Sequence, residues 1–208
     1  MLMQSKKSFL KSIIAAVSFS VVALSGQSVS AETDLAYFAG GCFWCIEKDF
    51  EYVDGVLEVQ SGYQGGQSKN PTYQNHSGFI ESVRISYDTS VIDYAQLLKI
   101  YFRSVDPTDA GGQFCDRGHA YTTAIFASNS EEVRLAEAAK AEAASFLNQD
   151  IATVIRGNDK FWLAEKYHQN YYKKNSVRYN YYRFSCGRDR TVEKLWGDAA
   201  YLGIGHKK

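Results

Sequence analysis

The sequence predicts an α+β fold: a two-layer sandwich with a ferredoxin-like βαββαβ core and an irregular C-terminal segment that wraps it. Two observations lead to this prediction. Segments whose apolar residues alternate at a period of two are interleaved with segments whose apolar residues recur every three or four positions. The first six segments run strand, helix, strand, strand, helix, strand, which is the order of a split βαβ arrangement.

The first strand and the first helix meet at a pair of glycines. Residues 35–39 are a short apolar run that ends at Gly40 and Gly41, which predicts a buried strand. Residues 42–52 place apolar and aromatic side chains three and four positions apart, so they predict an amphipathic helix.

The second and third strands enclose a long loop. Residues 56–63 predict the second strand. Residues 64–77 are polar and contain Pro71, which predicts a loop long enough to suggest a function. Residues 79–87 are the clearest strand, because apolar and polar side chains alternate along most of its length.

The second half of the core repeats the pattern. Residues 93–105 predict a helix with one apolar stripe, and residues 107–118 predict a second long loop. Residues 120–127 predict the fourth strand. Ser128 and Glu131 have capping-box spacing, which predicts the start of a third, Ala-rich helix.

The last part of the chain carries a weaker pattern. The third helix is predicted to end near Leu147, and residues 151–155 predict a last short strand. The region after Arg156 is aromatic-rich and is predicted to be mostly irregular, with a helix over residues 164–174.

Residues 1–31 are expected to be a cleavable secretory signal. Three lysines precede an apolar run over residues 13–24, and the small residues Val29-Ser30-Ala31 resemble a signal-peptidase site. The alternative is an uncleaved membrane anchor, but the run is shorter than the ~20 residues that a spanning helix needs. A single mature domain of residues 32–208 is therefore expected, exported to the periplasm or secreted.

Charge and composition exclude two kinds of partner for this mature chain. It carries 20 basic and 23 acidic residues without a basic block, so nucleic-acid binding is not expected. No later segment is apolar enough to span a membrane. Both methionines, Met1 and Met3, lie in the leader, so the mature chain has none. Methionine is readily oxidised, and its absence suits an oxidising compartment.

Cys42 is the first candidate for chemistry. It follows a strand and a glycine turn and opens a helix, where unpaired backbone N–H groups and the helix dipole favour a thiolate. Cys45 completes a C-x-x-C pair, which fits a redox pair, half of a zinc site or a structural disulfide. Zinc needs two further ligands at suitable spacing. The other cysteines and the histidines are scattered, so no metal site is predicted.

Glu81 lies on the apolar face of its strand, between Phe79 and Val83. If that face points inward, loss of solvent raises the pKa of the carboxyl group, and a carboxylic acid that is protonated near neutrality can donate a proton. The alternatives are a buried glutamate with a structural partner and a face that is exposed. Asp116, Tyr73 and Tyr121 are ordinary on their own: a turn aspartate and two of fifteen tyrosines.

Several segments together resemble the A-type peptide methionine sulfoxide reductases. The resemblance begins at the Gly-Cys-Phe-Trp signature and extends over nearly all of the mature chain. The matching segments are Gly40-Gly41-Cys42-Phe43-Trp44, Ser61-Gly62-Tyr63 with Gly65-Gly66, Asn70-Pro71-Thr72-Tyr73, Gly78-Phe79-Ile80-Glu81-Ser82-Val83, Asp106-Pro107-Thr108, Asp116-Arg117-Gly118-His119-Ala120-Tyr121 and Ala164-Glu165-Lys166-Tyr167-His168-Gln169.

The resemblance implies a nucleophile, an acid and a polar pocket. The Cys42 thiolate would attack the sulfur of a methionine sulfoxide while Glu81 protonates its oxygen. Tyr73 and Tyr121 would hydrogen-bond that oxygen, and Asp116 would support the polar network nearby. Such an enzyme needs no cofactor.

The same resemblance implies a binding wall, a product and a partner. Phe43 and Trp44 would hold the substrate's methyl group. Cys42 would become a sulfenic acid, which condenses with a second cysteine to a disulfide. A thioredoxin-like protein would then reduce that disulfide. The substrate would be the S epimer at sulfur, free or in proteins, since one enzyme serves one epimer.

The resolving cysteine is the least determined residue of the predicted site. Cys45 stands where the family commonly has glycine, and Cys186 precedes a helical segment rather than a Gly-rich tail. Cys186 is the preferred candidate, because a mobile late segment can carry a thiol to Cys42 and the family tends to resolve from its C-terminal region. Cys45 and Cys115 are the alternatives.

Two other classes of protein share some of these features. A thioredoxin-like thiol–disulfide oxidoreductase has the same strand, C-x-x-C and helix, but it normally needs a proline that faces the site, and Pro71 and Pro107 both lie in predicted loops. A secreted binding domain held by two disulfides is the non-enzymatic alternative. Insulin reduction tests the first, and a count of free thiols tests the second.

Overall fold

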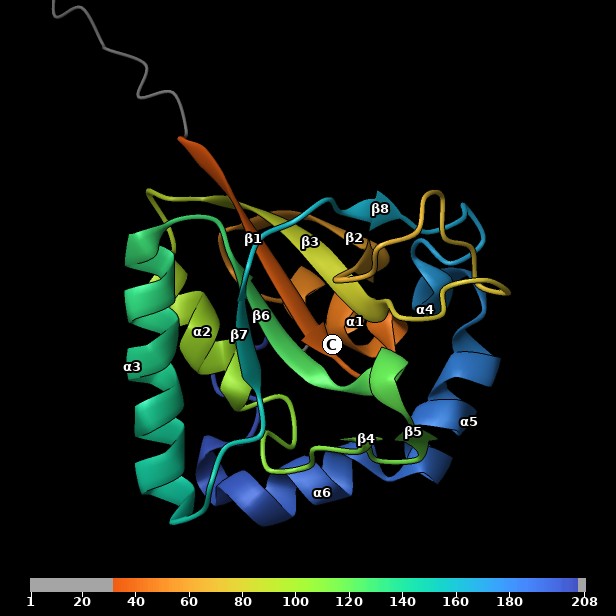
Figure 1. Ribbon diagram of the computed structural model, residues 1–208. Coiled ribbons are helices and arrows are strands. Elements are labelled where there is room, and N and C mark those ends of the chain that lie inside the picture. Colours follow the sequence, from red (N-terminus) through yellow and green to blue (C-terminus); the bar gives the residue numbers. More distant parts are fainter. Residues whose placement is uncertain (1–31, 206–208) are drawn as a thin grey trace, which may run out of the picture. The chain divides into compact units, whose positions relative to one another are not determined.

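A six-stranded sheet is the central layer of the protein (Figure 1). The computed structural model describes residues 32–205, so the predicted signal over residues 1–31 lies outside the described residues. The sheet has the order β7-β6-β1-β3-β2-β8. Its strands are β1 (Thr33–Gly40), β2 (Val56–Gln64), β3 (Ile80–Asp88), β6 (Thr123–Ala127), β7 (Val154–Gly157) and β8 (Trp162–Leu163).

The four central strands confirm the predicted ferredoxin-like core. Neighbours in the order β6-β1-β3-β2 are all antiparallel. Helix α1 (Phe43–Glu51) connects β1 to β2, and helix α2 (Tyr94–Phe102) lies between β3 and β6 in the chain. Helix α3 (Ser130–Leu147) then leads to β7, which is parallel to β6, while β8 adds antiparallel to β2.

The main core lies between the sheet and the helices. Phe43, Ile46 and Phe50 of α1 are buried at the predicted three- and four-residue spacing, and they pack in one cluster with sheet residues such as Phe38 and Ile85. Burial of each such aliphatic or aromatic side chain contributes roughly 1.5–3 kcal/mol to the free energy of folding. This cluster therefore fixes the position at which β1 ends and α1 begins.

The predicted cap of the third helix was one residue too early. Asn129, not Ser128, is the N-cap of α3, and its side chain accepts a hydrogen bond from the Glu132 backbone N–H at 2.9 Å. Glu132 in turn accepts from the Ser128 N–H at 2.8 Å. Asn129 therefore caps the helix in place of Ser128, and the Glu132 carboxylate accepts from the residue before the N-cap rather than from the N-cap itself.

The second long loop contains a small hairpin. Strands β4 (Gly112–Gln113) and β5 (Asp116–Arg117) pair antiparallel, with Phe114 and Cys115 at the tip. The predicted fourth strand begins later than expected, because residues His119–Tyr121 form a short 3-10 helix, η1. The hairpin and η1 hold Asp116 and Tyr121 in ordered structure.

The C-terminal segment is mostly helical, which corrects the prediction of an irregular wrap. It contains α4 (Tyr171–Lys174), α5 (Ser176–Cys186) and α6 (Arg188–Trp196), drawn in blue in Figure 1. The predicted helix over residues 164–174 is confined to α4. Helix α6 is the helical segment expected after Cys186, whereas α5 was not predicted, because its buried side holds Tyr179 and Arg183 rather than an apolar stripe.

Among residues 32–205, no helix combines the length and the hydropathy required to cross a membrane.

Candidate active site

Cys42 occupies the turn between β1 and α1. Gly41 has a φ of 81°, and a Cβ at that position would lie 2.5 Å from the Cβ of Gln113, so the turn requires glycine. Cys42 is the N-cap of α1. Its side chain is 7% exposed and lines a small cavity.

The structure brings together all seven residues that the sequence predicted for catalysis or substrate binding. They surround a cavity of about 60 Å³, which admits only the end of a substrate side chain. The cavity is lined by Cys42, Phe43, Trp44, Tyr73, Glu81, Asp116, Tyr121 and Tyr182.

Glu81 enters this cavity from β3. It is 2% exposed, as expected for an inward-facing residue, and it accepts a hydrogen bond from the Phe43 backbone N–H at 3.0 Å. Burial raises the pKa of Glu81 to about 8, although the Phe43 N–H lowers it and the negative charge of Asp116 adds to the increase. Glu81 is therefore protonated at neutral pH and can donate a proton.

Cys42 and Cys45 are free thiols that share a hydrogen bond inside the protein. Burial raises the pKa of Cys42, and the neighbouring Cys45 and Glu81 raise it further. The pKa of Cys45 falls to about 6, first because the Cys42 thiol donates a hydrogen bond to it and then because Arg188 and Arg183 are nearby. The helix start was expected to favour a thiolate on Cys42, but burial raises the pKa of Cys42, while the hydrogen bond from Cys42 and the two nearby arginines lower the pKa of Cys45.

Two buried arginines hold positive charge next to this pair. Arg188 of α6 donates hydrogen bonds to the Gly40 carbonyl at 3.0 Å and to the Ser104 carbonyl at 2.9 Å. Arg183 of α5 pairs with Asp49 at 2.8 Å and with Asp189 at 2.7 Å. The C-terminal helices thus supply the charge that favours a thiolate in the C-x-x-C pair.

The polar wall of the cavity comes from three separate segments. Tyr73 lies in the loop between β2 and β3, Tyr121 ends η1, and their hydroxyl groups interact with each other. Asp116 of β5 accepts a hydrogen bond from the Tyr182 hydroxyl of α5, and burial raises the pKa of Asp116. Tyr182 also contacts the Cys42 thiol.

Tyr182 is the one cavity residue that the sequence did not indicate. It is one of fifteen tyrosines and stands in a helix that the sequence did not predict. Tyr182 is close to Cys186 in the sequence, but no motif distinguishes it from the neighbouring residues.

The apolar wall is held in place by aromatic contacts. Trp44 stacks on Tyr171 with ring centres 3.8 Å apart, and its indole N–H donates a hydrogen bond to Nδ1 of His168 at 3.0 Å. Burial lowers the pKa of His168, which keeps Nδ1 available as an acceptor. The Phe43 ring lies 4.9 Å from the His168 ring, so one histidine positions both members of the apolar wall.

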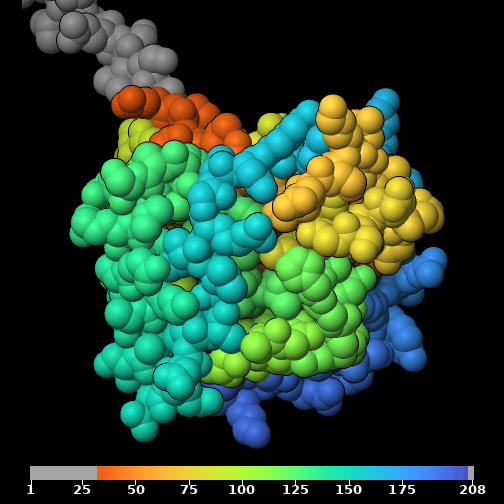
Figure 2. Space-filling model, viewed as in Figure 1, coloured from red at the N-terminus to blue at the C-terminus, as the bar shows by residue number. Residues whose placement is uncertain are grey.

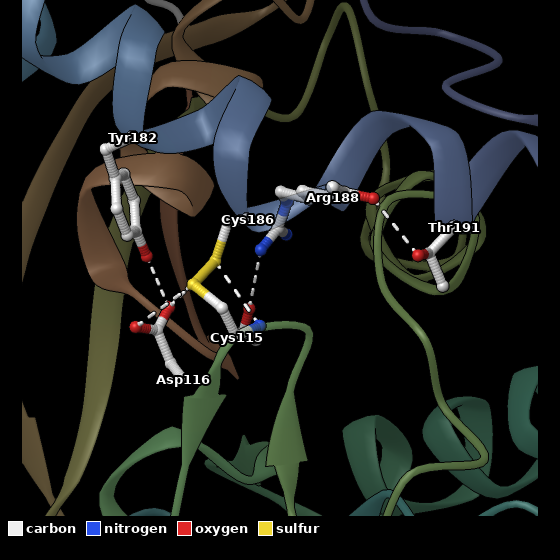
Figure 3. Close-up of a disulfide and its surroundings, with 8 residues drawn as sticks. Cys115, Asp116, Tyr182, Cys186, Arg188 and Thr191 are labelled. Atoms are coloured by element: carbon white, nitrogen blue, oxygen red, sulfur yellow. Dashed lines mark hydrogen bonds between the residues drawn. A yellow bond between two sulfur atoms is a disulfide. The ribbon is translucent and has the colours of Figure 1, made fainter.

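A disulfide connects Cys115 to Cys186 at the edge of the site (Figure 3). It joins the tip of the β4–β5 hairpin to the last residue of α5. This pairing differs from the predicted one, in which a mobile Cys186 reaches Cys42. Cys186 ends an ordered helix, with Gly187 in the left-handed region as its C-cap. Cys115, Asp116 and Cys186 lie close enough to share a metal ion, but the two sulfurs bonded to each other offer no thiolate.

Comparison with known protein families gives one match that covers most of the chain. A family model described as peptide methionine sulfoxide reductase matches residues 34–200. The Rhizobium meliloti protein named peptide methionine sulfoxide reductase MsrA 2 is 54% identical over 179 residues, which cover 85% of this chain and 90% of that protein. The Caulobacter vibrioides protein of the same name is 44% identical, with 89% and 97% covered.

Solved structures agree with these sequence matches. The reduced form of Mxr1 from Saccharomyces cerevisiae is 31% identical, with a TM-score of 0.66 over 70% of this chain and 87% of that chain. Methionine sulfoxide reductase A of Corynebacterium diphtheriae is 26% identical, with a TM-score of 0.62 over 70% of this chain and 76% of that chain.

Proposed function

The chain belongs to the peptide methionine sulfoxide reductase family, and we propose that it reduces methionine S-sulfoxide, free or in proteins, to methionine. In proteins this reaction repairs oxidative damage. The observation that carries the proposal is the cavity of about 60 Å³ that Cys42 and a protonated Glu81 both line.

The first step requires a thiolate on Cys42. The hydrogen bond from Cys42 to Cys45 provides a path for the proton, so Cys45 acts as the base and Cys42 becomes the nucleophile. Arg183 and Arg188 favour the negative charge on Cys45 from which this transfer starts. The Tyr182 hydroxyl, which lowers the pKa of Cys42, favours the thiolate there.

Glu81 supports the attack as a general acid. The Cys42 thiolate attacks the sulfoxide sulfur, and Glu81 gives its proton to the sulfoxide oxygen. That oxygen passes to Cys42, which becomes a sulfenic acid, and methionine leaves with its sulfur reduced by two electrons. Tyr73 and Tyr121 donate hydrogen bonds to the oxygen during this transfer.

The walls of the cavity determine which epimer reacts. The oxygen must face Glu81 and the two tyrosines, while the methyl group must face Phe43 and Trp44. Because the nucleophile approaches from a third direction, only one configuration at sulfur satisfies all three contacts. The family resemblance assigns this configuration to the S epimer.

We propose Cys45 rather than Cys186 as the cysteine that resolves the sulfenic acid. Cys45 already contacts Cys42 within α1, whereas Cys186 is bonded to Cys115. The Cys45 thiol attacks the Cys42 sulfenic acid, water leaves, and a Cys42–Cys45 disulfide forms. A thioredoxin-like dithiol protein then supplies two electrons to restore both thiols.

Export to an oxidising compartment is also proposed. The lysine-rich start, the apolar run and Val29-Ser30-Ala31 motivate it, and the Cys115–Cys186 disulfide is consistent with it. N-terminal sequencing of the exported protein should begin at Glu32, while an intact Met1 on a cytoplasmic protein would argue against export.

The proposed activity is tested most simply with the separate epimers. With dithiothreitol as the reductant, the enzyme should consume methionine S-sulfoxide and leave methionine R-sulfoxide unchanged, as chromatography of the remaining epimers would show. Equal consumption of both epimers, or of neither, would reject the proposal.

A further inference from the structure

The two pairs of cysteines differ in their access to a protein reductant. Cys42 and Cys45 are 7% and 2% exposed, so a partner's thiol meets them only deep in the site. The Cys115–Cys186 disulfide lies at the surface, and Cys115 is exposed at the tip of the β4–β5 hairpin. A protein that delivers electrons as thiols therefore meets the Cys115 sulfur first.

An exposed apolar face of α5 leads to this disulfide. Val177, Tyr181 and Phe184 are 85%, 74% and 72% exposed. They stand four and three positions apart, which places them on one face of the helix, and the face ends two residues before Cys186. The opposite side of α5 carries the buried Tyr179 and Arg183. Clustered exposed apolar side chains of this kind mark interaction sites.

Two arginines beside the apolar face of α5 indicate the charge that the partner's surface should carry. Arg178 and Arg190 are exposed beside it, and the Arg190 guanidinium lies 5.7 Å from the centre of the Phe184 ring. Neither arginine forms an ion pair within the part of the chain that the structure describes. An apolar centre with a cationic rim fits a partner whose apolar patch is flanked by carboxylates.

We propose that the Val177–Tyr181–Phe184 face is the docking surface for the thioredoxin-like reductant, which delivers its electrons to the Cys115–Cys186 disulfide. The inference rests on the proposed function, because only a turning-over reductase consumes this reductant. Figure 1 shows α5 at the margin of the molecule, beside the hairpin that carries Cys115, and the blue C-terminal segment reaches the surface at that side in Figure 2.

The exchange at this surface balances as an ordinary thiol–disulfide reaction. The partner's thiolate attacks Sγ of Cys115, the Cys115–Cys186 bond breaks, and Cys186 leaves as a thiolate. The backbone N–H of Cys115 lies 3.3 Å from Sγ of Cys186 and stabilises that thiolate. The partner's second thiol then closes its own disulfide and frees Cys115. The partner loses two electrons, and the two cysteines gain them.

Asp116 and Tyr182 lie between the reduced pair and Cys42. Sγ of Cys186 lies 4.0 Å from the Asp116 carboxylate, whose partner Tyr182 contacts Cys42. A second exchange, from Cys186 and Cys115 to the Cys42–Cys45 disulfide, restores the catalytic thiols and reforms the surface disulfide.

Charged substitutions on the face test the docking surface. Phe184→Glu and Tyr181→Glu should each raise the KM for thioredoxin by at least about tenfold, as expected for aromatic residues central to an interface, in assays with thioredoxin reductase and NADPH. Turnover with dithiothreitol should stay at the wild-type rate. Val91→Glu is the control and should leave the KM for thioredoxin unchanged, since Val91 is also an exposed apolar residue but lies before α2, outside this face.

The outcomes separate the two proposals. No turnover of the wild-type enzyme with dithiothreitol would reject the reductase function itself. Normal turnover with dithiothreitol and an unchanged KM for thioredoxin in both aromatic variants would reject the docking surface. A wild-type dimer that Phe184→Glu converts to a monomer, without a change in KM, would assign the face to self-association instead and would equally overturn the proposal.

Trapping tests the point of electron delivery. A thioredoxin that lacks its second active-site cysteine should form a stable mixed disulfide with Cys115, which peptide mapping by mass spectrometry would locate. A mixed disulfide with Cys42 or Cys45, while the Cys115–Cys186 bond stays intact, would show that the reductant bypasses the surface pair.

Discussion

Replacement of Cys42 by serine should abolish methionine release, even in a single turnover. A hydroxyl group in place of the thiol has no thiolate to attack the sulfoxide sulfur and cannot become a sulfenic acid. Rapid quenching after one equivalent of methionine S-sulfoxide, followed by quantification of methionine, measures this directly. The expected yield from Cys42→Ser is none, against one equivalent from the wild-type protein.

Cys45→Ser is the control for this experiment. It removes the proposed base and the resolving thiol but keeps the nucleophile, so it should still release one equivalent of methionine, at a reduced rate. Cys42 should then stay as a sulfenic acid, which a dimedone label identifies. Stoichiometric methionine from Cys42→Ser would overturn the assignment of the nucleophile.

Glu81→Gln should slow the formation of the sulfenic acid by roughly 10²–10⁴-fold, the range typical of a lost general acid. Glutamine keeps the size of the side chain and can donate a hydrogen bond, but it does not deliver a proton to the sulfoxide oxygen. Rapid-quench measurement of methionine in a single turnover isolates this step from the later disulfide exchange.

The pH dependence of the same step gives a second signature of Glu81. Its pKa is about 8, so the rate should fall as the pH rises through that value and the acid loses its proton. The pKa of Cys45 is about 6, so the rate should also fall as the pH drops through that value and the pair becomes fully protonated. The pH–rate profile of Glu81→Gln should no longer fall at alkaline pH but should still fall at acid pH.

Glu47→Gln is a matched control for Glu81→Gln. Glu47 is also a buried carboxyl, and burial raises its pKa to about 7, but it accepts a hydrogen bond from Asn170 and does not line the cavity. Glu47→Gln should show a rate near that of the wild-type enzyme, and this rate should still fall at both acid and alkaline pH. A wild-type rate in Glu81→Gln, or an unchanged alkaline limb, would remove Glu81 from the role of acid.

The sequence predicted best where one physical rule dominates. Strict alternation in β3 placed Glu81 among inward apolar residues, and the structure shows it buried with a raised pKa. The glycine turn before Cys42 predicted a helix start, and Cys42 is the N-cap of α1. Family motifs predicted Tyr73, Asp116 and Tyr121, which come from separate loops and share one cavity.

The sequence predicted least where several elements act on one residue. The charge of the C-x-x-C pair depends on Arg183 and Arg188, which are distant in the chain and reach it only through α5 and α6. Helix α5 was not predicted, because it buries Tyr179 and Arg183 and its pattern does not resemble an amphipathic stripe. The Cys115–Cys186 bond follows from the placement of these helices, and spacing alone gave no reason to pair these two cysteines.

The most direct test of this account is disulfide mapping after a single turnover. The protein, with Cys42 and Cys45 reduced, receives one equivalent of methionine S-sulfoxide without reductant, and mass spectrometry then identifies its disulfides. We expect one equivalent of methionine, a new Cys42–Cys45 disulfide and an intact Cys115–Cys186 disulfide. A Cys42–Cys186 disulfide, or methionine formed while Cys42 and Cys45 both stay reduced, would contradict it.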